Sequence, residues 1–275
     1  MEHLNITDPH VHSPFYFTTS VNDFDTIEDF EAKVLCLAGT KKPGDFSYTE
    51  VPPSWAIRVF KALDEEYPHR KTWNSKDLVL RLKMPVRVHD CHQAWISGEM
   101  QEWRTVPGLW SQADNRLCGL GVGTTIDYTT GPLSGSKKEP DLLFCVNSLP
   151  YPTFAIESGW SESAPALMRD KDLLLNAAQG ETSVVIIIKW KKNVHNQVSA
   201  GLKVFRWGQP IPTEVMTIFP RPANSSQQVI NLTRREVMGQ ALPWGSNPND
   251  ILPLHVDELR SRAVYYLNIM GLTHA

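Results

Sequence analysis

Three short apolar runs lie close together in the middle of the chain and predict strands. Leu142 to Val146 and Thr153 to Glu157 are separated by a proline-flanked break, and Val184 to Ile188 is the most apolar run of the sequence. Short apolar runs bounded by turn residues are typical of buried strands. The polar segment from Ser161 to Gly180 has the length of a helix. The pattern therefore predicts the order strand, strand, helix and strand.

Upstream of this region, apolar residues recur every three or four positions, which is the period of an amphipathic helix. The spacing predicts one helix from Val21 to Gly39 and a second from Pro53 to about Tyr67. A third is predicted from about Val86 to Thr105, between two prolines that mark its ends. We therefore expect residues 1–84 to form an N-terminal arm and a helical cap.

Two groups of polar residues in this part of the chain are candidates for chemistry. Asp8, His10 and His12 are residue types that ligate metals, although a solvated terminal arm is the alternative. His89 and Asp90 open the third predicted helix. There His89 could pack and Asp90 could cap the first turn, where a carboxylate is favoured by the helix dipole. A role of this pair in a site is the other hypothesis.

The C-terminal part reads as an extension of the sheet. Strands are predicted from Val198 to Trp207, from Glu214 to Phe219 and from Val229 to Leu232, and a final helix from Val256 to Leu267. The predicted fold class is therefore α/β. We expect residues 85–275 to form a core with a C-terminal strand extension, and the N-terminal cap to pack onto this core as one compact unit.

Length and composition fit a globular protein rather than a disordered chain. The chain has 275 residues, of which 41% are hydrophobic, so it can bury a sizeable core. Its four cysteines are spaced neither as a zinc ribbon nor as a disulfide framework, which favours reducing surroundings. We find no signal-peptide pattern and no run long enough to cross a bilayer. We therefore expect an intracellular protein, nuclear or cytoplasmic, without a membrane partner.

The charge balance requires any contact with nucleic acid to be local. With 27 basic and 30 acidic residues, the net charge is only −3. Lys137 and Lys138 lie in a predicted hairpin connection, and Lys189, Lys191 and Lys192 follow the third apolar run. These lysines are candidates for a basic rim that binds a phosphate backbone. A solvated hairpin surface is the alternative.

Asp141 and Glu157 lie at the ends of the first two predicted strands. If these strands pair as a hairpin, both carboxylates reach the same edge of the sheet. Two buried like charges are costly without a cation. Carboxylates bind hard divalent ions, and such an ion activates water for phosphodiester hydrolysis. The pair therefore predicts a site for Mg²⁺ or Mn²⁺, with solvated strand ends as the alternative.

These residues resemble the PD-(D/E)XK superfamily of nucleases, which has a restriction-endonuclease-like fold. The resemblance rests on Glu139-Pro140-Asp141, on the segment from Pro152 to Ser163, and on Leu167, Asp170 and Gly180. It covers about residues 86–239 and is closest to fungal proteins with this fold. It implies a mixed sheet flanked by helices, a divalent metal, usually Mg²⁺, and cleavage of nucleic acid such as DNA. Asp141 and Glu157 would be the catalytic, metal-binding carboxylates, with Asp90 on the preceding helix.

One position departs from the pattern of the superfamily. A lysine usually follows the second carboxylate by two residues, and this chain has Gly159 there. In some relatives the lysine has moved to the following helix, which makes Lys171 the first candidate and Lys189 the second. Gly159 permits a sharp turn away from the strand, so that the carbonyl of Ser158 could bind the metal.

Two hypotheses about function follow. The first is a divalent-metal-dependent nuclease that acts through Asp141 and Glu157, with Asp90 and Lys171. The second is a catalytically inactive protein of the same fold that serves as a nucleic-acid-binding or protein-interaction module, because a fold alone does not establish an activity. Gly159 keeps the second hypothesis open.

Overall fold

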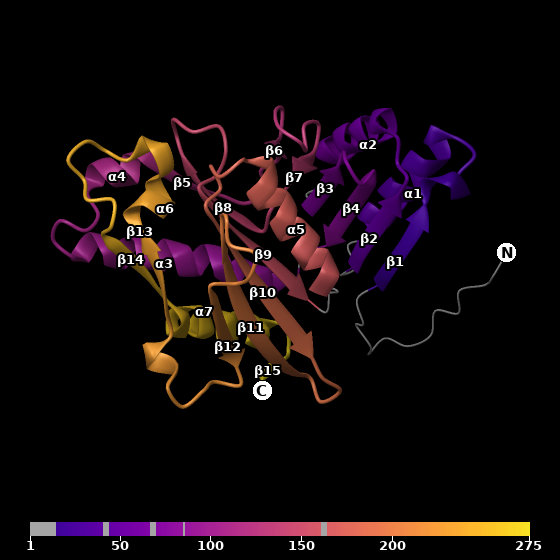
Figure 1. Cartoon of the computed structure of the whole chain (residues 1–275). Helices are drawn as coiled ribbons and strands as arrows, with labels where there is room; N and C mark the ends of the chain where they lie inside the picture. Colours follow the sequence, from indigo (N-terminus) through magenta and orange to yellow (C-terminus); the bar gives the residue numbers. More distant parts are fainter. Residues whose placement is uncertain (1–14, 41–43, 67–69, 85, 161–163) are drawn as a thin grey trace.

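The computed structural model describes residues 15–40, 44–66, 70–84, 86–160 and 164–275. The fold is mixed α/β and contains two large sheets, with the smaller, N-terminal one at one end of the molecule (Figure 1). The candidate metal ligands Asp8, His10 and His12 lie outside the described residues, as do residues 161–163 at the start of the predicted helical segment.

The N-terminal region contains a sheet as well as helices, so the expectation of a cap made of helices alone is wrong. Its six strands follow the order β1-β2-β4-β3-β7-β6. Their bounds are Phe15–Ser20 (β1), Gly44–Thr49 (β2), Arg70–Asn74 (β3), Val79–Met84 (β4), Ile126–Asp127 (β6) and Lys137–Lys138 (β7). Helices α1 (Ile27–Gly39) and α2 (Pro53–Glu66) fall within the predicted segments. α1 begins after Thr26, whose hydroxyl accepts the main-chain N–H of Asp29.

The two faces of this N-terminal sheet have opposite character. On one face, Phe46, Tyr48, Leu80 and Leu82 pack into an apolar core with α1 and α2. Successive side chains of a strand point to opposite faces, so the residues between these apolar positions form the other face. We call this second face the polar face. It comprises Thr18, Asp45, Ser47, Thr49, Arg70, Thr72, Asn74, Arg81, Lys83 and Lys138.

The second sheet has seven strands. Three of them, with the helix that connects the last two, follow the predicted order strand, strand, helix and strand. Its path is β12-β11-β10-β9-β8-β5, with β15 beside β11. Their bounds are Cys118–Gly121 (β5), Leu142–Val146 (β8), Phe154–Trp160 (β9), Val184–Lys192 (β10), Gln197–Arg206 (β11), Glu214–Phe219 (β12) and Thr273–His274 (β15). β8 and β9 pair antiparallel, as predicted, whereas β9 and β10 pair parallel and are connected through α5 (Ala164–Ala177).

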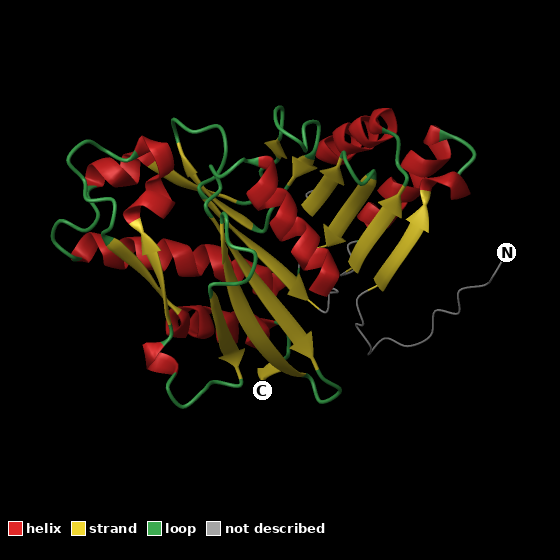
Figure 2. Cartoon of the chain, in the orientation of Figure 1, coloured by secondary structure: helices red, strands yellow, loops and turns green. Residues whose placement is uncertain are grey.

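Helices cover both faces of the seven-stranded sheet (Figure 2). The other helices of the second region are α3 (Cys91–Thr105), α4 (Gln112–Leu117), α6 (Arg234–Met238) and α7 (Val256–Ile269). On one face, Leu174 of α5 packs against Ile187 of β10 in an apolar cluster. On the other face, Trp95 of α3 and Leu259 of α7 share a core with Ile186. β10 is therefore apolar on both faces, which explains why it is the most apolar run of the sequence.

A small sheet completes the C-terminal part. It pairs β13 (Val229–Thr233) with β14 (Ile251–His255), and the second of these strands was not predicted. α6 opens with a capping box formed by Thr233 and Glu236 and ends at Gly239, which has a φ of 56°. Within the described ranges, no helix is long and apolar enough to span a membrane.

Candidate functional site

The two predicted carboxylates meet between the sheets. β8 and β9 pair in a register that sets Leu142 opposite Ile156, which brings Asp141, just before β8, beside Glu157 of β9. Both side chains are fully buried. The main-chain N–H of Ser158 donates to Oδ2 of Asp141 at 2.7 Å. We call Asp141 and Glu157 the carboxylate site.

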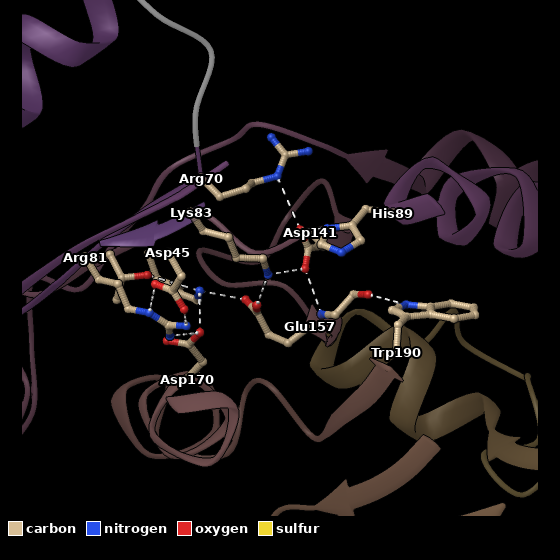
Figure 3. Close-up of polar contacts among 12 residues, drawn as sticks. Asp45, Arg70, Arg81, Lys83, His89, Asp141, Glu157, Asp170 and Trp190 are labelled. Carbon is tan, nitrogen blue, oxygen red and sulfur yellow. Dashed lines mark hydrogen bonds and ion pairs between the residues drawn. The ribbon is translucent and has the colours of Figure 1, made fainter. Parts of the chain in front are cut away.

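A lysine from the other sheet bridges the carboxylate site (Figure 3). The ammonium of Lys83, on β4, lies 2.6 Å from Oδ2 of Asp141 and 3.4 Å from Oε2 of Glu157. Lys83 is itself 7% exposed, so the contact is shielded from water. The N-terminal sheet thus supplies the Lys83 ammonium to the two carboxylates, in a chain that has Gly159 where the motif has a lysine.

Further charged residues continue from Glu157 across the polar face. The ammonium of Lys138 lies 2.7 Å from Oε1 of Glu157, as an ion pair without hydrogen-bond geometry, and 3.4 Å from Asp170 of α5. Arg81 donates from Nη1 to Asp170 at 2.8 Å and from Nε to Asp45 at 2.7 Å. These five residues, together with Lys83 and Asp141, are called the ion network below.

Glu139, the first residue of the Glu139-Pro140-Asp141 segment, is also paired with the N-terminal sheet. Its Oε1 lies 2.9 Å from the ammonium of Lys71 on β3 and accepts the hydroxyl of Thr125 at 2.7 Å. Glu139 and Lys71 are 3% and 2% exposed. Both acidic residues of this segment are therefore neutralised by lysines from the first 84 residues.

Burial of the ion network costs free energy unless every charge in it has a partner of opposite sign. Moving a charge from water into a protein interior costs several kcal/mol per ion, and a partner with good geometry offsets that cost. The network contains four carboxylates and three cations, and Arg70 adds a fourth positive charge 3.7 Å from Asp141. The charges are therefore balanced, and each one depends on a neighbour from another strand or helix.

The opposite side of Asp141 is lined by aromatic and imidazole groups. The Nδ1 atom of His89 lies 3.4 Å from Oδ1 of Asp141, and the His89 ring stacks on His92. His92 in turn stacks on Trp190, whose indole N–H donates to the Ser158 hydroxyl at 2.8 Å. Within the described residues, Oδ1 of Asp141 and both His89 nitrogens have no hydrogen-bond partner. Oδ1 of Asp141 thus has charged and imidazole neighbours but no hydrogen bond in the described part of the chain, so it could accept a further ligand.

The surroundings separate the pKa values of the two carboxyls. Burial raises the pKa of Asp141, but Lys83 and His89 outweigh burial and hold it well below its usual range. Burial also raises the pKa of Glu157, and Lys138 and Lys83 offset this only in part, so that it stays above its ordinary value. Asp141 is therefore the ionised member, and Glu157 is the more basic one. Such a division suits one carboxyl to bind charge and the other to accept a proton.

Asp141 and Glu157 offer carboxylate oxygens, which are donors of the kind that a hard cation binds. No group of three or more His, Cys, Asp or Glu side chains in the described part of the chain has an arrangement that could hold a metal ion. Asp141 and Glu157 supply only two side chains, so the carbonyl of Ser158 and water would have to complete the shell. Oxygen donors are the ligands that Mg²⁺ requires, and Oδ1 of Asp141 lacks a hydrogen-bond partner.

Two predicted catalytic residues lie outside this arrangement. Asp90 is exposed before α3 and makes no side-chain cap, whereas its neighbour His89 is the residue that approaches Asp141. Lys171 pairs with Asp172 and lies 5.1 Å from the centre of the Phe205 ring. It forms no ion pair with Glu157.

The five lysines of the predicted basic rim fall into different surroundings. Lys138 is 2% exposed in the ion network, and its neighbour Lys137 pairs with Asp127. Lys189 and Lys191 line a groove of about 450 Å³ on the face of β10, β11 and β12. Burial lowers the pKa of Lys189 to about 8. Lys192, at the end of β10, is partly exposed.

Sequence reasoning missed Arg81, Lys83 and Asp45, although a signal for two of them was present. Residues 79–84 alternate between apolar and basic side chains, which is the pattern of a strand with one buried and one polar face. That pattern lies between segments with helical spacing and was not interpreted as a strand. Asp45 lies in a segment without such a signal.

The chain matches no protein-family model and no curated protein.

Proposed function

We propose that the protein is a divalent-metal-dependent nuclease of the PD-(D/E)XK superfamily that hydrolyses phosphodiester bonds of nucleic acid, with DNA as the first substrate to test. Residues 85–275 would carry a restriction-endonuclease-like core. One observation carries the proposal: Lys83 lies 2.6 Å from Asp141 and 3.4 Å from Glu157. The cation that the motif lacks at Gly159 is thereby supplied from β4.

Each residue of the carboxylate site has a separate task in this proposal. Asp141, Glu157 and the carbonyl of Ser158 would hold Mg²⁺ or Mn²⁺, which would supply an activated water and neutralise phosphate charge. Lys83 donates to a phosphate oxygen as negative charge develops there, the kind of interaction that contributes most to such reactions.

Substrate binding requires Lys83 and Lys138 to change partners. Without substrate, both lysines are paired with carboxylates of the ion network. A phosphodiester would bring a negative charge to which Lys83 and Lys138 could turn, and Asp141 and Glu157 would then be available to hold the metal. The exchange keeps buried charges paired, which is the condition under which their burial is tolerated.

The test is a cleavage assay with purified protein and end-labelled single-stranded and double-stranded DNA and RNA, in Mg²⁺ or Mn²⁺. We expect Asp141→Asn to lower cleavage by about 100-fold or more, since an essential charge of the site is lost. Equal cleavage by wild type and Asp141→Asn would point to a contaminating enzyme. That result, or no cleavage of any of these substrates, contradicts the proposal.

The second candidate is a catalytically inactive protein of the same fold that binds nucleic acid or another protein. It is favoured by the complete burial of Asp141 and Glu157, whose charges Lys83 and Lys138 already neutralise. Calorimetric titration with Mn²⁺, with and without an oligonucleotide, separates the two candidates. Absence of Mn²⁺ binding under both conditions would favour the inactive protein.

A further inference from the structure

The polar face of the N-terminal sheet runs without interruption from the sheet edge to the carboxylate site. Strand register sets Thr18 opposite Ser47, Ser47 opposite Arg81, Arg81 opposite Thr72, and Thr72 opposite Lys138. Lys138 pairs with Glu157. One row of hydrogen-bonding side chains therefore crosses five strands and ends at the carboxylate site.

A pocket of about 360 Å³ opens over the outer part of this row. It lies between the sheet and α5, and is lined by Thr18, Ser47, Thr49, Thr72, Asn74, Asp77, Val79, Arg81, Arg169, Asp170 and Leu173. Its position is set by the same helix that carries Asp170 into the ion network. The pocket thus shares Arg81, Asp170 and Thr72 with the surroundings of the carboxylate site.

The groups that lack partners in this pocket are hydrogen-bond donors. Within the described residues, the hydroxyls of Thr18 and Ser47 and the guanidinium of Arg169 have no hydrogen bond or ion pair. The two acidic groups differ. Asp170 accepts from Arg81, which neutralises it, whereas among the described residues the exposed Asp77 accepts only from the neutral amide of Asn74 at 2.9 Å and keeps its charge. Beside Asp77, the pocket therefore offers the guanidinium of Arg169 and two hydroxyls to a ligand that accepts hydrogen bonds.

We propose that this pocket binds one unpaired nucleotide of a nucleic-acid strand, with its phosphate on Arg169. A guanidinium with neighbouring hydroxyl donors suits phosphate oxygens, and Asn74 and the apolar side chains of Val79 and Leu173 suit a sugar and base. The volume is that of a site for a small molecule and excludes a duplex. This inference rests on the proposed function, because it identifies the substrate as a single-stranded segment or end beside the carboxylate site.

The proposal is tested by binding in EDTA, where no metal-dependent cleavage occurs. The probe is a fluorescein-labelled oligothymidylate, and fluorescence anisotropy reports its Kd. We expect Arg169→Gln to weaken binding about tenfold, which corresponds to about 1.4 kcal/mol. Because one phosphate contact is lost, the slope of log K against log salt should also fall by about 0.7. A structural defect alone would not remove one phosphate contact from the salt dependence.

Arg116→Gln is the matched control, because Arg116 is an exposed arginine on α4 with no side-chain ion pair among the described residues. Ser47→Ala, which removes one hydroxyl from the pocket, should weaken binding in the same direction by a smaller factor. Wild-type affinity in Arg169→Gln, or equal weakening by Arg116→Gln, overturns the proposal. So does a wild-type preference for duplex over the single strand.

Competition by thymidine monophosphate and by inorganic phosphate identifies the ligand more closely. Displacement of the oligonucleotide by the mononucleotide at lower concentration than by phosphate supports a nucleotide pocket. Equal displacement by both shows an anion site only and overturns the nucleotide assignment. The result is independent of cleavage. Binding that depends on Arg169 in a protein that does not cleave would support the nucleotide pocket and contradict the nuclease activity. Cleavage by a protein whose binding is unchanged in Arg169→Gln would support the nuclease activity and contradict the nucleotide pocket.

Discussion

The two large sheets of this protein differ in the side chains that they bury. In the seven-stranded sheet, β10 buries apolar side chains on both faces, under α5 on one side and α3 and α7 on the other. In the N-terminal sheet only one face is apolar, and the other buries Arg81, Lys83 and Lys138. A charged face needs partners of opposite sign, and these are Asp45 on the same face and the carboxylates Asp141, Glu157 and Asp170 from the second region. The carboxylate site and its ion network are therefore assembled by packing one sheet against the other.

The largest effect is expected from breaking the ion network. Arg81→Met leaves Asp45 and Asp170 buried without their guanidinium, and loss of one member of a buried ion pair costs about 3–5 kcal/mol. In the seven-stranded sheet, Ile186→Val should cost about 0.5–1.5 kcal/mol. Urea unfolding of both variants measures the two changes in free energy. Equal decreases in the free energy of unfolding would show that a buried charge in the N-terminal sheet matters no more than a buried apolar side chain in the seven-stranded sheet.

Next in size is the effect of Lys83 on catalysis. If Lys83 donates to the reacting phosphate, Lys83→Met should lower the rate of cleavage by about 100-fold, or about 2.7 kcal/mol. The single-turnover rate at saturating metal and substrate is the quantity to measure, with circular dichroism as the check on folding. A folded Lys83→Met variant that cleaves at the wild-type rate would remove β4 from the proposed mechanism.

A smaller, pH-dependent effect is expected behind the carboxylate site. Burial and the neighbouring His89 lower the pKa of His92 to about 3, from the ordinary histidine value of 6.5. Below about pH 6.5 the unfolded chain therefore binds a proton at His92, whereas the folded protein binds this proton only near pH 3. The free energy of unfolding therefore decreases as the pH is lowered from about 6.5 to about 3. His92→Leu should remove about 1.4 kcal/mol per pH unit from that slope. Urea unfolding between pH 4.5 and 7.5 gives the slope, and an unchanged slope in the variant would contradict this expectation.

The smallest effect is expected at Lys171. Its ammonium pairs with the exposed Asp172, a kind of contact that contributes about 0–1 kcal/mol. We expect Lys171→Met to unfold within about 1 kcal/mol of wild type and to cleave at the same rate. A loss of cleavage comparable to that of Lys83→Met would instead restore Lys171 as the relocated lysine of the motif.

The parts of the site that were predictable are local in the sequence. The order β8, β9, α5 and β10 follows from short apolar runs and one polar segment, and the β8–β9 hairpin then brings Asp141 to Glu157. Lys83 lies 58 residues before Asp141, and no local spacing relates the two. Its contact depends on how two sheets pack, which periodicity does not encode. Lys138 was noticed as a charge, but its burial depends on the same packing.

The pairing of β7 with β3 has a consequence for the modularity of the chain. β6 and β7 come from residues 126–138 yet complete the N-terminal sheet, so the polypeptide returns to its first sheet after α3 has been made. A fragment that begins at residue 85 would keep both carboxylates but expose the edge of β7 and leave Lys138 without Thr72 beneath it. The site therefore cannot be transplanted or inherited as the C-terminal segment alone. Any recombination event that separates the two halves would divide the carboxylates from the lysine that bridges them.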